Sequence, residues 1–157
     1  MASFLVRALA LPPTSQDFFV DDETSTHEDN INRLAASGIT HGCATQRFCP
    51  KAVVTREQMA SFLARAFELP ATSDDFFIDD ETSTHESNIN SLAASGITSG
   101  CAAARYCPKA LVTRGQMAAF LERALFSVGT TSTSSTAAAA ASDPTADRER
   151  IQVGATK

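Results

Sequence analysis

The sequence is poor in residues that several classes of protein need. It has no tryptophan and only one tyrosine among 157 residues, and its net charge is −5. The acidic balance argues against a nucleic-acid-binding protein that relies on a basic surface. No apolar run approaches the roughly 20 residues that a membrane-spanning helix requires. We therefore expect neither nucleic-acid binding nor membrane insertion.

Catalytic and cofactor-binding motifs are missing too. His27-Glu28 begins the H-E-x-x-H pattern of zinc proteases, but Ile31 stands where the second histidine is required. The second copy, which begins at His85, fails in the same way at Ile89. No nucleophile elbow, phosphate-binding loop or dinucleotide fingerprint occurs. The sequence thus predicts a non-catalytic protein with no cofactor and no resident metal ion.

What the chain does contain is an internal repeat. Residues 1–58 and 59–116 are identical at roughly three quarters of their positions, which gives a period of about 58 residues. Met1, Met59 and Met117 open equivalent segments, "MASFL" twice and then "MAAFL". Met1 therefore occupies an internal position of the repeat, and we expect the chain to begin inside a unit.

The repeat ends near residue 126. Beyond it the sequence turns to serine, threonine and alanine, a composition that cannot build a packed core. The predicted organisation is a partial unit with one helix over 1–13, repeats over 14–70 and 71–126, and a disordered tail over 127–157.

Each unit is predicted to contain two helices joined by a loop. Ser25 and Glu28 have the spacing of a capping box, and Gly38 suits the left-handed position that follows a helix. Thr55 and Gln58 give a second capping box before the next helix. The predicted fold is therefore all-α, built from tandem helix–loop–helix repeats. The apolar faces expected in the first full repeat comprise Ile31, Leu34, Ala35, Met59, Phe62, Leu63 and Ala66.

The four cysteines form two closely spaced pairs. Five residues separate Cys43 from Cys49, and five separate Cys101 from Cys107. A disulfide within each loop is predicted, because the even count fits an oxidising compartment. A four-cysteine zinc site is the rival, although its usual spacing within a pair is two to four residues. Free buried thiols are a third reading, and the C-x-x-C pattern of redox enzymes is absent.

Acidic residues gather ahead of the first helix of each unit. Asp21, Asp22, Glu23, Ser25 and Glu28 offer oxygen ligands for calcium, but they lack the loop pattern of an EF-hand. Acidic residues before a helix are also favoured by the helix dipole. A calcium site and a capping role both stay open at this point. The second copy, which begins at Asp79, has the same two readings.

Two arginines, Arg56 and Arg114, stand at the first position of helices predicted to begin after threonine caps. A guanidinium group can hold an anion through two parallel hydrogen bonds. The alternative is a solvated residue of an amphipathic helix. A lysine lies five residues before each arginine and adds charge nearby. The candidate binding residues are thus Lys51, Thr55, Arg56, Lys109, Thr113 and Arg114.

Several motifs occur in one fixed order: "FFVDD", "INRLAASGITHG", "RFCP" and "VTREQMASFLARAFEL", each with a second copy. In that order they resemble the S-layer homology (SLH) family, in the cysteine-containing variant of secreted actinobacterial proteins. The resemblance covers residues 17–69 and 75–126, plus the partial unit 1–11. The family's motif usually reads T-R-A-E, whereas Gln58 and Gln116 replace its final glutamate here.

The resemblance implies helical units around a pseudo-threefold axis, incomplete here because fewer than three units are whole. It also implies attachment to an anionic, often pyruvylated, cell-wall polysaccharide, with Arg56 and Arg114 at the glycan. The expected protein is an extracellular, cell-wall-associated anchoring module, and self-association that completes the bundle is a further expectation. Two alternatives stay open: a purely structural or assembly module, and the non-catalytic end of a secreted hydrolase.

Overall fold

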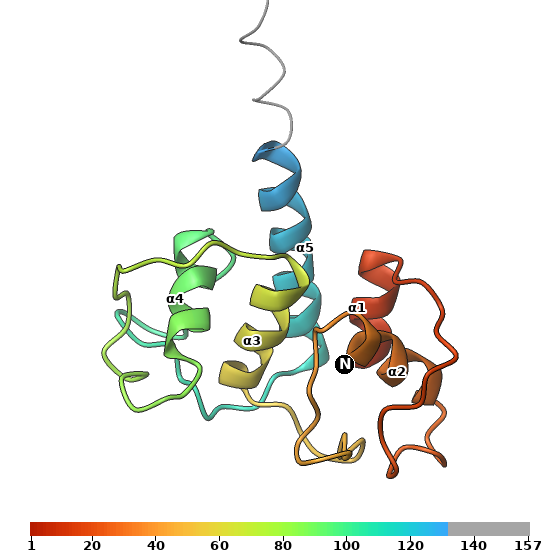
Figure 1. Ribbon diagram of the computed structural model, residues 1–157. Coiled ribbons are helices and arrows are strands. Elements are labelled where there is room, and N and C mark those ends of the chain that lie inside the picture. The colour runs from red at the N-terminus through yellow and green to blue at the C-terminus, as the bar shows by residue number, and fades with distance from the viewer. Residues whose placement is uncertain (132–157) are drawn as a thin grey trace, which may run out of the picture.

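The computed structural model describes residues 1–131, with side chains described as far as Ser127. This part of the chain contains five helices and only isolated β-bridges, which confirms the all-α prediction (Figure 1). None of these helices is long and apolar enough to span a membrane. The helices are α1 (Ala2–Leu9), α2 (Glu28–Ala36), α3 (Arg56–Ala66), α4 (Glu86–Ala94) and α5 (Arg114–Thr131).

The predicted tail lies mostly outside the described residues, which end at 131. Helix α5 continues to Thr131 and so includes the first residues assigned to that tail.

The capping boxes of α3 and α5 are confirmed. Thr55 Oγ1 accepts a hydrogen bond from the N–H of Gln58 (3.4 Å), and the Thr55 N–H donates to Gln58 Oε1 (3.1 Å). Thr113 and Gln116 make the same pair of bonds at 3.2 and 3.0 Å. Two otherwise unpaired backbone groups are satisfied at each helix start, which explains why both helices begin one residue after threonine.

The capping box predicted between Ser25 and Glu28 is wrong. The backbone turns tightly before the helix, with the Ser25 N–H donating to the Asp22 carbonyl (2.7 Å). This turn leaves Ser25 Oγ within reach of the His27 N–H (3.2 Å), and α2 begins only at Glu28. The second unit repeats the geometry at Ser83, whose hydroxyl accepts from the His85 N–H.

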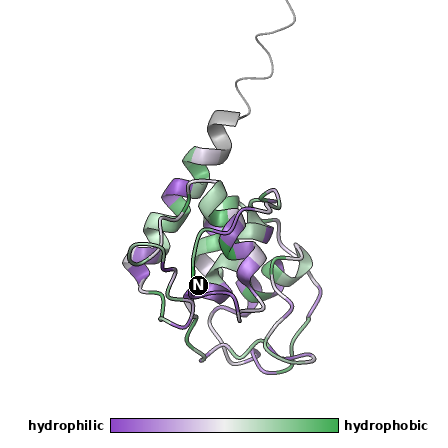
Figure 2. Cartoon of the chain, turned by 90° about the vertical axis from the view of Figure 1, so that its left-hand side faces the viewer, coloured by the Kyte–Doolittle hydropathy of each residue, from purple (hydrophilic) through white to green (hydrophobic). Residues whose placement is uncertain are grey.

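The helices pack as consecutive pairs, α1 with α2 and α3 with α4 (Figure 1). A polar contact accompanies each pair: Ser3 bonds His27 at 3.0 Å, and Ser61 bonds His85 at 2.7 Å. The buried apolar side chains form one continuous cluster, and the helices carry many of the strongly hydrophobic stretches in Figure 2. The exposed His27 and the half-buried His85 thus each link the start of one helix to the helix before it.

Each complete unit buries one aspartate side chain without a hydrogen-bond partner in the described part of the chain. Asp22 and Asp80 are fully buried, and neither side chain has a hydrogen-bond partner among the described residues. Burial raises the pKa of Asp22, and it raises the pKa of Asp80 to about 6. Nearby negative charges add to the effect at Asp80, namely those of Asp75, Glu86 and Asp79.

We expect the Asp80→Asn substitution to stabilise the protein at pH 7 by about 2 kcal/mol, because asparagine has no charge to bury. The folded-state pKa of Asp80, about 6, lies above its ordinary value of 3.8. The stability linked to this group is therefore fully present below pH 3.8 and lost as the pH rises through 6. Urea unfolding at pH 4, 5.5 and 7 should show the variant's advantage shrinking towards low pH.

The Asp74→Asn change is the matched control, because Asp74 is exposed and its charge is not among those that raise the pKa of Asp80. An Asp80→Asn advantage that is the same at pH 4 as at pH 7 would contradict the titration of Asp80.

Candidate functional site

The two cysteine loops are closed by disulfides, as predicted. Cys43 is bonded to Cys49 and Cys101 to Cys107, with the α-carbons 6.0 Å apart in each pair. All four cysteines are thereby used, so the zinc and free-thiol alternatives are wrong. We call residues 43–54 loop 1 and residues 101–112 loop 2.

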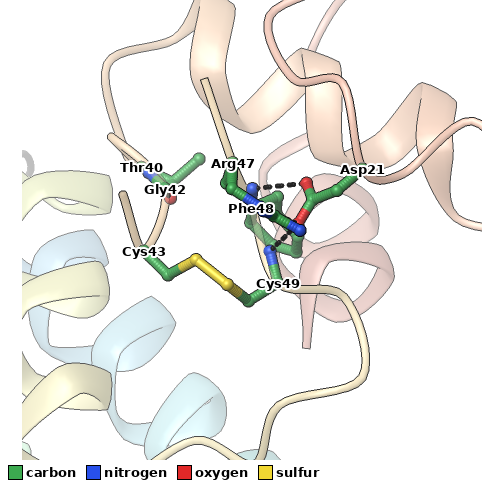
Figure 3. Close-up of a disulfide and its surroundings, with 7 residues drawn as sticks. All are labelled: Asp21, Thr40, Gly42, Cys43, Arg47, Phe48 and Cys49. Atoms are coloured by element: carbon green, nitrogen blue, oxygen red, sulfur yellow. Dashed lines mark hydrogen bonds and ion pairs between the residues drawn. A yellow bond between two sulfur atoms is a disulfide. The ribbon is translucent and has the colours of Figure 1, made fainter. Parts of the chain in front are cut away.

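An aspartate from the start of each unit holds its loop in place (Figure 3). The Asp21 carboxylate accepts hydrogen bonds from the backbone N–H groups of Phe48 (2.8 Å) and Cys49 (3.0 Å). Arg47 lies 3.6 Å from the same carboxylate. The Phe48 and Cys49 donors, together with Arg47, hold the pKa of Asp21 below its ordinary value. Asp79 makes the matching bonds to Tyr106 and Cys107 in loop 2.

The calcium reading of the acidic residues is not supported by the described part of the chain. Its acidic, histidine and cysteine side chains form no cluster of three or more that could hold a metal ion. The Asp21 carboxylate already accepts a hydrogen bond from the loop backbone, and the Asp22 side chain is fully buried. The Asp21 carboxylate therefore holds loop 1 in place.

Loop 2 receives the start of α3, which belongs to the preceding unit. The N–H of Arg56 donates to the Ala110 carbonyl (2.8 Å), and the N–H of Glu57 donates to the Pro108 carbonyl (3.0 Å). In return, the Val112 N–H donates to the Val54 carbonyl (3.0 Å). We call this set of contacts the junction; it joins the two complete repeats through backbone hydrogen bonds.

The Arg56 side chain is sealed inside the junction, with 5% of its surface exposed. Its Nε donates to the Tyr106 carbonyl (2.8 Å), and the Tyr106 hydroxyl donates back to the Arg56 carbonyl (2.9 Å). The guanidinium carbon lies 4.7 Å from the Tyr106 ring centroid and 5.4 Å from that of Phe120. Arg56 thus holds two repeats together and presents no open face to an outside ligand.

Glu57 and Lys109 form an ion pair across the same junction. Lys109 Nζ lies 2.7 Å from Glu57 Oε1, and the Ser83 hydroxyl donates to Glu57 Oε2 (2.8 Å). Burial alone would raise the pKa of Glu57, but the Lys109 ammonium and the Ser83 hydroxyl hold it below its ordinary value. Lys109, expected as a glycan contact, therefore has a partner within the protein.

Arg114 differs from Arg56 in its exposure, although it too lies over an aromatic ring. It is exposed, and its guanidinium carbon lies 4.8 Å from the centroid of the Phe4 ring of α1. Gly115 stands where α3 has Glu57, so the first turn of α5 carries no acidic side chain. The start of α5 thus combines a positive side chain, the positive end of a helix dipole and an open approach.

A pocket of about 300 Å³ lies between loop 1, α1 and α3. Phe48 and Phe62 provide its aromatic walls, and Arg65 and the chain's three histidines lie at its polar parts. Lys51 is exposed on the same loop, outside this pocket. Of the six candidate residues, the structure therefore brings Thr55, Arg56 and Lys109 together at the junction and leaves Lys51, Thr113 and Arg114 elsewhere on the surface.

Sequence reasoning missed the contacts of two junction residues, Tyr106 and Glu57, and those of Asp79, which holds loop 2 within its own unit. Their partners lie about 27 to 52 residues away, beyond the reach of local patterns. One signal was available, because Asp21 and Phe48 recur as Asp79 and Tyr106 with the same separation.

The family model of the S-layer homology domain matches the chain twice, over residues 19–60 and 78–118. The two matches together span more than half of the chain, and each includes one loop and the helix start that follows it. No curated protein matches the chain.

Proposed function

Because the chain belongs to the S-layer homology family, whose domains are cell-surface anchoring modules that bind cell-wall polymers, we propose that it binds an anionic cell-wall polysaccharide. The match of both repeats to that family is the observation that carries the proposal. A carboxylated glycan, such as a pyruvylated one, is the proposed ligand. The protein would act outside the cell, without catalysis, by attaching whatever it is joined to.

The proposed contact is the start of α5. Arg114 supplies an exposed guanidinium group, and Thr113 fixes the helix start through its capping bonds. The absence of a side chain at Gly115 leaves room for a carboxylate to approach the backbone N–H groups. By contrast, Glu57 at the equivalent position of α3 would repel an anion. The proposal therefore rests on Arg114 rather than on Arg56.

The proposal includes a pseudo-threefold arrangement of the helices that follow the loops. Arg56 of α3 stacks on Phe120 of α5, and Arg114 of α5 stacks on Phe4 of α1. These two contacts, from α3 to α5 and from α5 to α1, are consistent with a closed ring of the three helices. Of these three helices, α3 and α5 each follow a complete unit in the given sequence.

A titration of purified anionic wall polysaccharide tests the glycan contact. We expect Arg114→Ala to weaken binding about tenfold, because a charge-assisted hydrogen bond contributes roughly 1.5–3 kcal/mol. Arg7→Ala is the matched control, since it removes an exposed arginine from α1 without touching the start of α5. Equal affinities of Arg114→Ala and Arg7→Ala would refute the assignment of Arg114.

A purely structural or assembly module is the second candidate. It is favoured by the burial of Arg56, since one of the two arginines expected at a glycan is used to hold repeats together. If no wall polysaccharide binds to the native chain at low salt, this candidate replaces the first.

A further inference from the structure

The pocket beside loop 1 has the same walls as the junction at loop 2. At loop 2 the start of α3 contacts Tyr106, Pro108, Ala110, Val112 and Phe120. One repeat period earlier in the sequence, the equivalent residues are Phe48, Pro50, Ala52, Val54 and Phe62. All five of these equivalents line the pocket. The pocket is therefore lined by the repeat equivalents of the residues that bind the start of α3 at loop 2, but no helix start of the described chain lies in it.

Loop 1 is more exposed than loop 2 at the residues that would contact a helix start. Tyr106 and Pro108 are buried, whereas Phe48 and Pro50 are only half-buried. The Val112 N–H donates to the Val54 carbonyl, whereas the Val54 N–H donates no hydrogen bond within the described residues. Lys109 is paired with Glu57, whereas Lys51 has no acidic partner in this part of the chain. Loop 1 thus offers an aromatic surface, a backbone N–H group and a lysine that correspond to the groups with which loop 2 binds the start of α3.

We propose that this pocket is a docking site for a helix start of the Thr-Arg-Glu type, leading into α1. The guanidinium group would lie against Phe48 and Phe62 and donate to the Phe48 carbonyl, as Arg56 does with Tyr106 and Phe120. The acidic residue after the arginine would pair with Lys51, as Glu57 pairs with Lys109.

The register favours an occupant continuous with α1. Arg56 lies three residues before Met59, and Met1 is the repeat equivalent of Met59 and lines the pocket. An arginine three residues before Met1 would therefore fall between the two aromatic rings. The inference does not depend on glycan binding, because it concerns only contacts between protein segments.

The test is a five-residue extension of the full chain, Val-Thr-Arg-Glu-Gln, placed directly before Met1. This is the sequence of residues 54–58, which precede Met59. Val-Thr-Ala-Glu-Gln is the matched control, since it lengthens the helix equally but lacks the guanidinium group. We expect the arginine version to unfold at least about 4 °C higher than the alanine version. Phe48→Leu should remove most of this difference.

Hydrogen exchange gives a second measurement on the same proteins. Exchange of the Val54 N–H should slow at least about tenfold with the arginine extension, towards the rate of Val112, its bonded equivalent. Equal midpoints and equal Val54 rates in the two extended proteins would overturn the proposal. So would protection of the Val54 N–H in the unextended chain by wall polysaccharide or by dimerisation, since the pocket would then belong to a glycan or a second copy.

Discussion

Arg56→Ala is expected to destabilise the protein by about 3 kcal/mol or more, although arginine is ordinarily a surface residue. The substitution removes a charge-assisted bond to the Tyr106 carbonyl and the stacking on the Tyr106 and Phe120 rings. It also leaves a void among buried groups, which adds to the loss. Chemical denaturation monitored by circular dichroism would measure the change.

Arg114→Ala is the matched control for this experiment. It removes the same side chain from the same helix position, but Arg114 is exposed and contacts only one ring, that of Phe4. We expect a loss of roughly 0.5–1 kcal/mol, the usual value for an exposed cation–π contact. Similar losses for the two substitutions would show that Arg56 is not a structural centre of the junction.

Gly42→Ala is the second change with a large expected effect, about 3 kcal/mol or more. Gly42 lies in the same loop region as Arg47 (Figure 3) and has a φ of 80°. A β-carbon there would collide with the Arg47 carbonyl oxygen and lie 2.7 Å from the Phe19 ring. The Arg47 carbonyl also accepts the Cys43 N–H, so the loop cannot move aside without losing that bond. Thermal unfolding of the oxidised protein would measure the effect.

Gly38→Ala separates the steric effect from that of the backbone angle. Gly38 also has a positive φ, 68°, but no atom lies within 4 Å of the position of an added β-carbon. Only the left-handed backbone penalty applies, about 1–2 kcal/mol. If Gly42→Ala costs no more than Gly38→Ala, the close packing of loop 1 on Phe19 is incorrect.

Local features of the fold could be predicted from the sequence. The Thr55 capping box and the left-handed Gly38 depend on neighbouring residues, and both agree with the structure. The disulfide pairing was predictable for a similar reason, because each pair lies within one short loop. The Ser25 box was wrong because the turn at Asp22 shifts the helix start, and its spacing alone could not reveal that turn.

The role of Arg56 could not be predicted from local sequence. Its side chain meets Tyr106, 50 residues away, and a Thr-Arg pair at a helix start has the same appearance whether exposed or buried. One difference between the repeats was visible, however. Gly115 replaces Glu57 in the second repeat. The structure explains why this matters: the first turn of α3 carries an acidic side chain, whereas the first turn of α5 carries none.

Binding of the chain to isolated cell walls is the most direct test of the central claim, which is recognition of an anionic wall polysaccharide. The chain would be sedimented with walls before and after chemical removal of that polysaccharide, with Arg114→Ala in parallel. We expect the native chain to sediment with intact walls and to stay in solution with stripped walls, and Arg114→Ala to sediment less. Equal sedimentation of the native chain with both wall preparations would contradict recognition of the polysaccharide.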